Sequence, residues 1–143
     1  MSRSFLFVPA DSGRKLEKAG GVGADALILD LEDAVAPAAK PTAREMAADY
    51  VHGKSDIWVR VNPVDGEYWE ADLEAVIPSR PAGIMLPKPR HARDAVKLSE
   101  RIDELEARHG IEAGQTKIIA LCTEHTEALF RLDSYVGTVP RVA

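Results

Sequence analysis

The feature that most constrains the fold is the alternation of short apolar segments with longer segments of helical periodicity. Five apolar segments have the length of a β-strand, and each is bounded by Gly, Pro or charged residues: 4–9, 26–32, 57–62, 82–88 and 117–123. A chain that inserts a helix between consecutive strands can bring each new strand into the sheet in the same direction as the one before. We therefore predict an α/β fold with a parallel sheet and about five βα units.

Five intervening segments are predicted to be helical: 13–20, 41–52, 66–77, 91–109 and 125–134. The segment 91–109 has the clearest periodicity, because its apolar residues from Ala95 to Leu105 recur every three or four positions. Its charged residues, Glu106 among them, are then interpreted as a solvated helix face.

Two architectures fit this alternation: an open doubly wound sheet, and part of an eight-unit barrel. No G-x-G-x-x-G follows the first predicted strand, and the glycines of 20–23 precede the second strand instead of opening a helix. This arrangement argues against a dinucleotide-binding domain.

Composition limits the number of domains, the classes of ligand, and the disulfides and zinc sites that this chain can have. The chain has 143 residues without a linker or a shift in composition, so we expect one domain over 1–143. Its 18 Lys and Arg against 23 Asp and Glu give a net charge of -5, which argues against nucleic acid as the main ligand. A small basic site for a phosphate-bearing cofactor remains compatible with this charge. Cys122 is the only cysteine, so neither an internal disulfide nor a cysteine cluster for zinc can form.

The sequence shows no apolar stretch near 18 residues and no signal-peptide pattern at its N-terminus. We therefore expect a soluble, cytoplasmic protein without a membrane span.

Polar side chains end four of the predicted strands: Asp30, Glu32 and Asp33 in ALILDLED, Arg60 and Asn62 in IWVRVN, Lys88 in AGIMLPK, and Glu124 after KIIALCT. Residues two apart on a strand share a face, so Lys88 is placed on the face of Ile84 and Leu86, and Glu124 on that of Ile118 and Ala120. The carboxyl ends of parallel strands carry the ligand sites of both barrels and open sheets. We predict that these polar residues share one site.

The residue types in this set indicate the chemistry of the site. Glu32, Asp33 and Glu124 offer the hard oxygen ligands that Mg²⁺ prefers. Arg60 offers a planar pair of donors that suits a carboxylate, and Asn62 adds donors. A divalent metal beside an arginine suits a small 2-oxo acid, whose carbonyl the metal can polarise.

Each of these residues also has a simpler interpretation when it is taken alone. Glu32 and Asp33 fit a helix cap or a solvated loop, Arg60 fits an ordinary buried ion pair, and Lys88 fits an exposed turn between two prolines. Glu124 fits the acidic start of a helix. It is the agreement between four separate strands that favours a shared site.

The segments RSFLFVPADSGRKLEKA, GADALILDLEDAVAP, IWVRVNP, GIMLPKPR and IIALCTE resemble, in order, the motifs of the citrate lyase β-subunit-like family of the HpcH/HpaI aldolase superfamily. The resemblance implies a Mg²⁺-dependent (β/α)₈ barrel, typically a trimer or hexamer, that breaks or forms a carbon–carbon bond. It implies acyl-thioester substrates such as citryl-, malyl- or citramalyl-CoA, or citryl on an acyl carrier protein, and a 2-oxo acid as product.

The resemblance also implies roles for individual residues. Glu124 matches the family's glutamate metal ligand, and Arg60 matches the arginine that binds the substrate carboxylate. Glu32 and Asp33 match the acids that hold metal-bound waters.

The same resemblance implies which residues bind the cofactor and how much of the barrel this sequence contains. Arg14, Lys15 and Lys88 would lie near the phosphates of the thioester carrier. The sequence holds about five of the eight βα units, and the family's second metal ligand, an aspartate, belongs to the next strand. We therefore expect the amino-terminal part of a TIM barrel without its carboxyl-terminal part.

Three explanations for this extent remain open: a truncated product of a longer gene, a half-barrel that completes itself by oligomerising, and a non-catalytic assembly or binding module. A thioesterase acting on malyl-CoA at the same metal site is the alternative enzymatic function.

Overall fold

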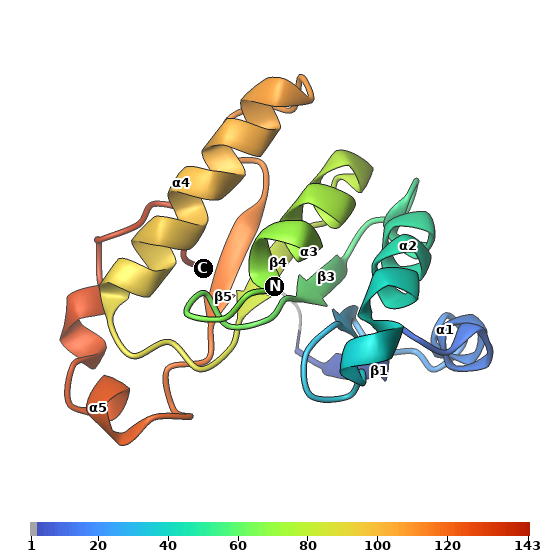
Figure 1. The fold of residues 1–143 in the computed structure, drawn as a ribbon, viewed down its shortest axis with the longest axis horizontal. Coiled ribbons are helices and arrows are strands. Elements are labelled where there is room, and N and C mark those ends of the chain that lie inside the picture. The colour runs from blue at the N-terminus through green and yellow to red at the C-terminus, as the bar shows by residue number, and fades with distance from the viewer. Residues whose placement is uncertain (1–2) are drawn as a thin grey trace.

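The computed structural model describes residues 3–143 and contains one parallel sheet of five strands in the order β1-β2-β3-β4-β5 (Figure 1). The strands are β1 (Phe5–Pro9), β2 (Ala26–Asp30), β3 (Ile57–Arg60), β4 (Gly83–Leu86) and β5 (Lys117–Ala120). Each strand pairs in parallel with the next one along the chain. The predicted parallel α/β fold is confirmed.

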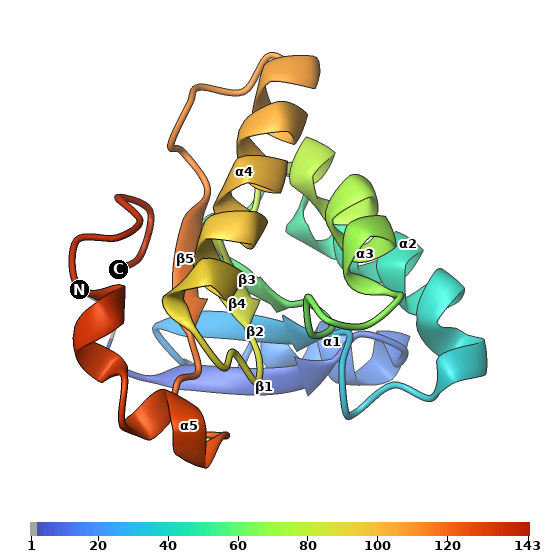
Figure 2. The same cartoon turned by 60° about the vertical axis from the view of Figure 1, so that its left-hand side comes forward.

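The helices are α1 (Gly13–Ala19), α2 (Lys40–Val51), α3 (Trp69–Val76), α4 (Ala92–Arg108) and α5 (Thr126–Leu129). Short 3-10 turns cover Pro37–Ala39, Ile77–Ser79 and Leu132–Tyr135. Helices α2, α3 and α4 lie side by side along the same face of the sheet (Figures 1 and 2). All five predicted helices are present, although 125–134 divides into α5 and a 3-10 turn.

The core lies between the sheet and these helices. Leu29, Val59 and Ile84 are fully buried on the helix-facing side of their strands, where they pack in one cluster with Leu98 and Ile102 of α4. Burial of this apolar surface is the main force that holds the helices to the sheet.

The other face of the sheet carries larger and more exposed side chains. Phe5 of β1 makes an edge contact with Trp58 of β3, with ring centroids 6.3 Å apart. The Arg60 guanidinium lies 4.9 Å from the centroid of the Phe7 ring. Trp58 crosses directly over Gly83, where an added Cβ would lie 2.2 Å from the Trp58 ring, so only glycine fits at this position.

The strand register corrects the predicted distribution of polar residues between the two faces. Arg60 pairs with Met85, whereas Ile84 pairs with Val59, which faces the helices. Ile118 pairs with Ile84 and therefore faces the helices as well. Ile84 and Ile118 therefore lie on the face opposite to Arg60, and the prediction that they lead up to the polar site is wrong.

The reason is that each strand ends before its polar residue. Strand β4 ends at Leu86 and β5 at Ala120, so Lys88 and Glu124 lie in the loops that follow. The alternation of side chains between faces applies only while the backbone stays in the sheet.

The last residues of the chain return to the sheet beside β5. Val142 forms a parallel bridge with Ile118, whose N–H donates to the Arg141 carbonyl at 2.9 Å. The Ala143 N–H donates to the Ile118 carbonyl at 3.0 Å. Residues 141–143 therefore take up the position of a further parallel strand next to β5.

A buried ion pair fixes this segment. The Arg141 guanidinium is 4% exposed and binds both oxygens of Glu106, itself 1% exposed, with contacts of 2.9 Å and 2.5 Å. It also contacts Asp103 and donates to the Thr116 carbonyl at 2.9 Å. The interpretation of Glu106 as part of a solvated helix face is therefore wrong.

Among the helices of residues 3–143, none combines the length and the apolar character that crossing a membrane requires.

Candidate functional site

Six charged residues gather at the carboxyl ends of β2 to β5, and we call them the strand-end cluster: Asp30, Glu32, Asp33, Arg60, Lys88 and Glu124. Asp30 and Arg60 are the last residues of β2 and β3 and stand opposite each other in the sheet register. The other four come from the loops that follow β2, β4 and β5.

Arg60 is held in place by two acids and one ring. Its Nε and Nη2 donate to the two Asp30 oxygens at 2.8 Å and 2.7 Å, which is the two-pronged geometry that fixes a guanidinium plane. Its Nη1 lies 3.0 Å from Glu32 Oε2. With Phe7 under the guanidinium plane, Arg60 has one defined orientation at the carboxyl end of the sheet.

Lys88 joins acids from two different loops. Its Nζ donates to Glu32 Oε1 at 2.5 Å and to both Asp33 oxygens at 2.9 Å. Its main-chain N–H donates to Glu124 Oε2 at 2.8 Å. A single residue thus contacts Glu32, Asp33 and Glu124. Glu32 and Glu124 are 92 residues apart in the sequence.

The pKa values reflect this packing of charges. Burial raises the pKa of Glu32, and the hydrogen bond from Lys88 together with the charge of Arg60 offsets this only in part. Lys88 lowers the pKa of Asp33, and the two acids in turn raise the pKa of Lys88 to about 12. Lys88 is consequently charged throughout the neutral range.

A second set of polar residues supports the cluster from the helix side. Asp72 of α3 is fully buried and accepts from the Asn62 main-chain N–H at 2.8 Å and from the Asn62 amide at 2.7 Å. Arg44 of α2 donates to the other Asp72 oxygen at 2.8 Å. Lys40 Nζ donates to Asn62 Oδ1 and to the Leu31 carbonyl, both at 2.8 Å.

This set changes the interpretation of Asn62. Its amide also donates to the Leu31 carbonyl at 3.0 Å, so its donors and its acceptor are used inside the protein. Sequence reasoning missed Lys40 and Asp72, because charged residues within helices usually face water. The one available indication was Asp72, which lies between the apolar residues Trp69, Leu73 and Val76 of a short helix.

The strand-end cluster borders an open cavity of about 400 Å³, lined in part by Glu32, Asp33, Asn62 and Lys88. Glu32 Oε2 is buried and, within residues 3–143, accepts no hydrogen bond, although it lies next to Arg60. A buried carboxylate oxygen that has an ion-pair partner but no hydrogen bond can still accept one, for example from a water bound to a hard cation.

The same described residues contain no preformed group of three or more acidic, histidine or cysteine side chains around one metal position. Glu124 is turned to the Lys88 main chain rather than to a shared centre with Glu32 and Asp33. The oxygen donors therefore fit Mg²⁺ by their chemistry, whereas this arrangement alone does not complete a coordination shell.

Arg14 and Lys15 lie in the first turn of α1, which begins shortly after the carboxyl end of β1. Both are exposed, and neither forms an ion pair within the described part of the chain. His125, next to Glu124, is the N-cap residue of α5, and its side chain forms no capping hydrogen bond with the helix.

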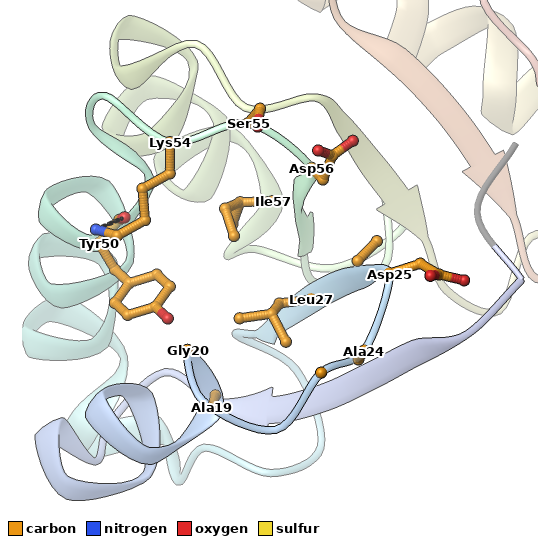
Figure 3. Close-up of a pocket in the computed structure, with 12 residues that line it drawn as sticks. Ala19, Gly20, Ala24, Asp25, Leu27, Tyr50, Lys54, Ser55, Asp56 and Ile57 are labelled. Carbon is orange, nitrogen blue, oxygen red and sulfur yellow. Dashed lines mark hydrogen bonds between the residues drawn. The ribbon is translucent and has the colours of Figure 1, made fainter.

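A further cavity of about 350 Å³ lies at the opposite end of the sheet, beside the first residues of β2 and β3 (Figure 3). Lys54 lies along Tyr50, with its Nζ 4.3 Å from the ring centroid and donating to the Tyr50 carbonyl at 2.7 Å. Asp25 accepts from the main-chain N–H groups of Arg3 and Ser4. Lys54 and Asp25 thus have partners within the protein itself.

Comparison with known proteins identifies the family of this chain. The profile of the HpcH/HpaI aldolase/citrate lyase family matches residues 3–143. This chain belongs to that family. It is 35% identical over 124 residues to the citrate lyase subunit beta of Haemophilus influenzae, covering 84% of this chain and 43% of that protein. It is 42% identical over 109 residues to a (3S)-malyl-CoA thioesterase of Cereibacter sphaeroides, covering 72% and 38%.

Solved structures of family members share the fold. The protein CitE of Mycobacterium tuberculosis in complex with magnesium and acetate superposes with a TM-score of 0.78 at 28% identity, covering 99% of this chain and 52% of that one. The same protein in complex with magnesium, acetoacetate and coenzyme A gives a TM-score of 0.76. The chain thus spans about two fifths of these two curated relatives and about half of the solved chains.

Proposed function

We propose that this chain is the amino-terminal part of a (β/α)₈ barrel that acts as a Mg²⁺-dependent carbon–carbon lyase on a short acyl thioester. Citryl-, malyl- or citramalyl-CoA, or citryl on an acyl carrier protein, would be cleaved to a 2-oxo acid and an acyl thioester. The observation that carries this proposal is the strand-end cluster, in which acids from three loops and strands meet a fixed arginine at the carboxyl end of a parallel sheet.

The acids of the cluster suit a magnesium site. Glu124 would be a direct ligand, and Glu32 and Asp33 would hold metal-bound waters. Mg²⁺, when bound, supplies positive charge that stabilises the negative charge developing on a keto oxygen. The binding of magnesium by the related CitE protein supports this assignment.

Arg60 suits the carboxylate of the 2-oxo acid. Asp30 and Phe7 fix its plane, so the guanidinium does not have to be ordered when substrate binds. Its Nη1 faces Glu32 Oε2, the position where a substrate carboxylate would compete for the arginine.

The steps of the cleavage reaction define what these groups would have to do. In the cleavage direction the substrate hydroxyl loses its proton, the carbon–carbon bond breaks, and its electron pair moves to the α-carbon of the thioester, which is then protonated. Arg60 would keep the departing 2-oxo acid oriented while this happens.

The carrier of the thioester would bind through its phosphates. Arg14 and Lys15 are exposed near the carboxyl end of β1 and are the candidates for this contact. Lys88 was predicted to serve the same purpose, but its Nζ is engaged with Glu32 and Asp33, so we assign it to the acids instead.

A thioesterase acting on malyl-CoA at this site is the second candidate, favoured by the 42% identity to the Cereibacter sphaeroides enzyme. Product analysis with citryl- and malyl-CoA separates the two: a lyase releases a 2-oxo acid together with an acyl-CoA, and a thioesterase releases free malate or citrate together with CoA. A stable oligomer that binds no Mg²⁺ and turns over neither substrate would instead indicate an assembly module.

Metal and 2-oxo acid binding can be tested without turnover. Mg²⁺ with oxaloacetate, pyruvate or glyoxylate should raise the melting temperature, because these ligands bind the native state. Glu124→Ala should remove the Mg²⁺-dependent part of this rise, whereas Glu127→Ala, an acid three residues further on in α5, should retain it. Absence of any rise in the wild-type protein, or equal rises in both variants, would contradict the proposed site.

A further inference from the structure

Lys88 connects the strand-end cluster in two independent ways. Through its side chain it binds Glu32 and Asp33, which follow β2. Through its main chain it binds Glu124, which follows β5. A single residue, Lys88 in the loop after β4, therefore determines how the acids that follow β2 and β5 approach each other.

The backbone at Lys88 is specialised for this geometry. Lys88 has a φ of 50°, a left-handed conformation that non-glycine residues seldom adopt, and it stands between Pro87 and Pro89. Such a conformation is strained and persists only where the surroundings hold it. The ion pairs and the Glu124 hydrogen bond are the contacts that hold it here.

Glu32 is only partly used by these contacts. Lys88 binds Oε1, whereas Oε2 is buried and forms an ion pair with Arg60 Nη1 at 3.0 Å but accepts no hydrogen bond within residues 3–143. Asp33 is more exposed, with 63% of its side chain accessible. Of the two acids that bind the ammonium group, Asp33 is thus accessible to a further cation, and Glu32 is shared between Lys88 and Arg60.

We propose that Lys88 is the protein's own counter-cation and positioning residue: its ammonium group holds Glu32 and Asp33 together before a divalent cation arrives, and then shares these carboxylates with it. The part that concerns the divalent cation rests on the proposed function. On this proposal the lysine limits how tightly the metal binds, because like charges repel at short range. It also keeps the acids from separating when the metal is absent.

Two substitutions separate the effect of the Lys88 ammonium charge from the effect of its strained backbone. Lys88→Met removes the ammonium group and keeps the strained φ, whereas Lys88→Gly removes the side chain and relieves the strain. Lys88→Arg keeps the charge. Arg80→Gly is a matched control, because Arg80 is a cation with a φ of 60° whose guanidinium contacts only the Gly110 carbonyl, at 3.4 Å, among the described residues.

The experiment is thermal melting of each variant in EDTA and across a Mg²⁺ titration. In EDTA, Lys88→Met should melt several degrees below the wild type, and Lys88→Gly should fall between the two. Mg²⁺ should raise the melting temperatures of both by roughly twice the wild-type rise or more, because it replaces the missing charge. Lys88→Arg and Arg80→Gly should show the wild-type rise.

The outcomes separate this inference from the proposed function. A positive wild-type rise that is equal or smaller in Lys88→Met and Lys88→Gly overturns the role of Lys88 and leaves the metal site intact. A rise in these variants but not in the wild type supports the role of Lys88 and contradicts the metal site of the native protein. No rise in any protein overturns the proposed function and the part of this inference that rests on it. Equal melting temperatures of Lys88→Met and the wild type in EDTA overturn the positioning role of Lys88.

Discussion

Replacing Glu106 by Gln tests whether a buried ion pair holds the last residues against the sheet. The Glu106 carboxylate is 1% exposed and accepts from Arg141, from the Gly114 N–H at 2.9 Å and from the Thr116 N–H at 2.8 Å. Burial alone would raise its pKa, but these donors outweigh burial and lower the pKa from 4.5 to about 2.

This shift corresponds to a free energy of folding of about 3 kcal/mol. Because the folded-state pKa lies below the unfolded value, the contribution is complete above about pH 4.5 and is lost as the pH falls toward 2. Glu106→Gln should therefore lower the free energy of unfolding at pH 7 by about 3 kcal/mol, since it also leaves the buried Arg141 with Asp103 as its remaining acid.

The assay is urea denaturation of both proteins at pH 7 and at intervals down to pH 3. The difference between them should shrink as the pH falls, because the carboxylate of the unfolded wild-type protein, with its pKa of about 4.5, takes up a proton that the folded protein does not bind, whereas the amide does not titrate. Glu104→Gln is the control, because Glu104 binds Arg101 at the surface, where such a pair is worth about 1 kcal/mol or less. A loss below about 1 kcal/mol at pH 7, or a difference that does not change with pH, would refute the reasoning.

Two further substitutions test the packing around the site. Arg60→Lys loses the paired contact with Asp30 and the stacking on Phe7, so it should weaken 2-oxo acid binding at least about tenfold and lower the free energy of unfolding by about 1–3 kcal/mol, measured by calorimetric titration and urea denaturation. Unchanged binding would contradict the role of Arg60. Gly83→Ala places a Cβ against the Trp58 ring and the Lys117 carbonyl and should cost about 3 kcal/mol or more, with a change in tryptophan fluorescence; a neutral effect in denaturation would show that Trp58 can move aside.

The sequence was sufficient to predict the order of the elements. The five apolar segments are separated by amphipathic ones, and this alone determines a parallel sheet with helices between its strands. The periodicity of 91–109 predicted α4 to within one residue at each end, because apolar residues at helical spacing need a single buried face.

The arrangement of side chains at the site was less accessible. The alternation rule was applied beyond Leu86 and Ala120, where the backbone has already left the sheet, so Lys88 and Glu124 were predicted to lie at the carboxyl end for the wrong reason. Glu106 was assigned to water because its neighbours on α4 are charged. Its burial depends on Arg141, which lies 35 residues further along the chain, and no local pattern reveals such a partner.

The supporting residues on the helices explain why the cluster can remain charged while it is packed. Asn62 lies two residues after the end of β3, and its contacts to Asp72 on α3 and Lys40 on α2 fix the start of the loop that follows Arg60. Lys40 also binds the Leu31 and Glu32 carbonyls, which fixes the backbone that carries Glu32. The helices thus position the strand-end acids through buried hydrogen bonds as well as covering the core. A site arranged in this way depends on the helix layer for its geometry, so the loss of Asp72 or Lys40 should disturb Glu32 and Arg60.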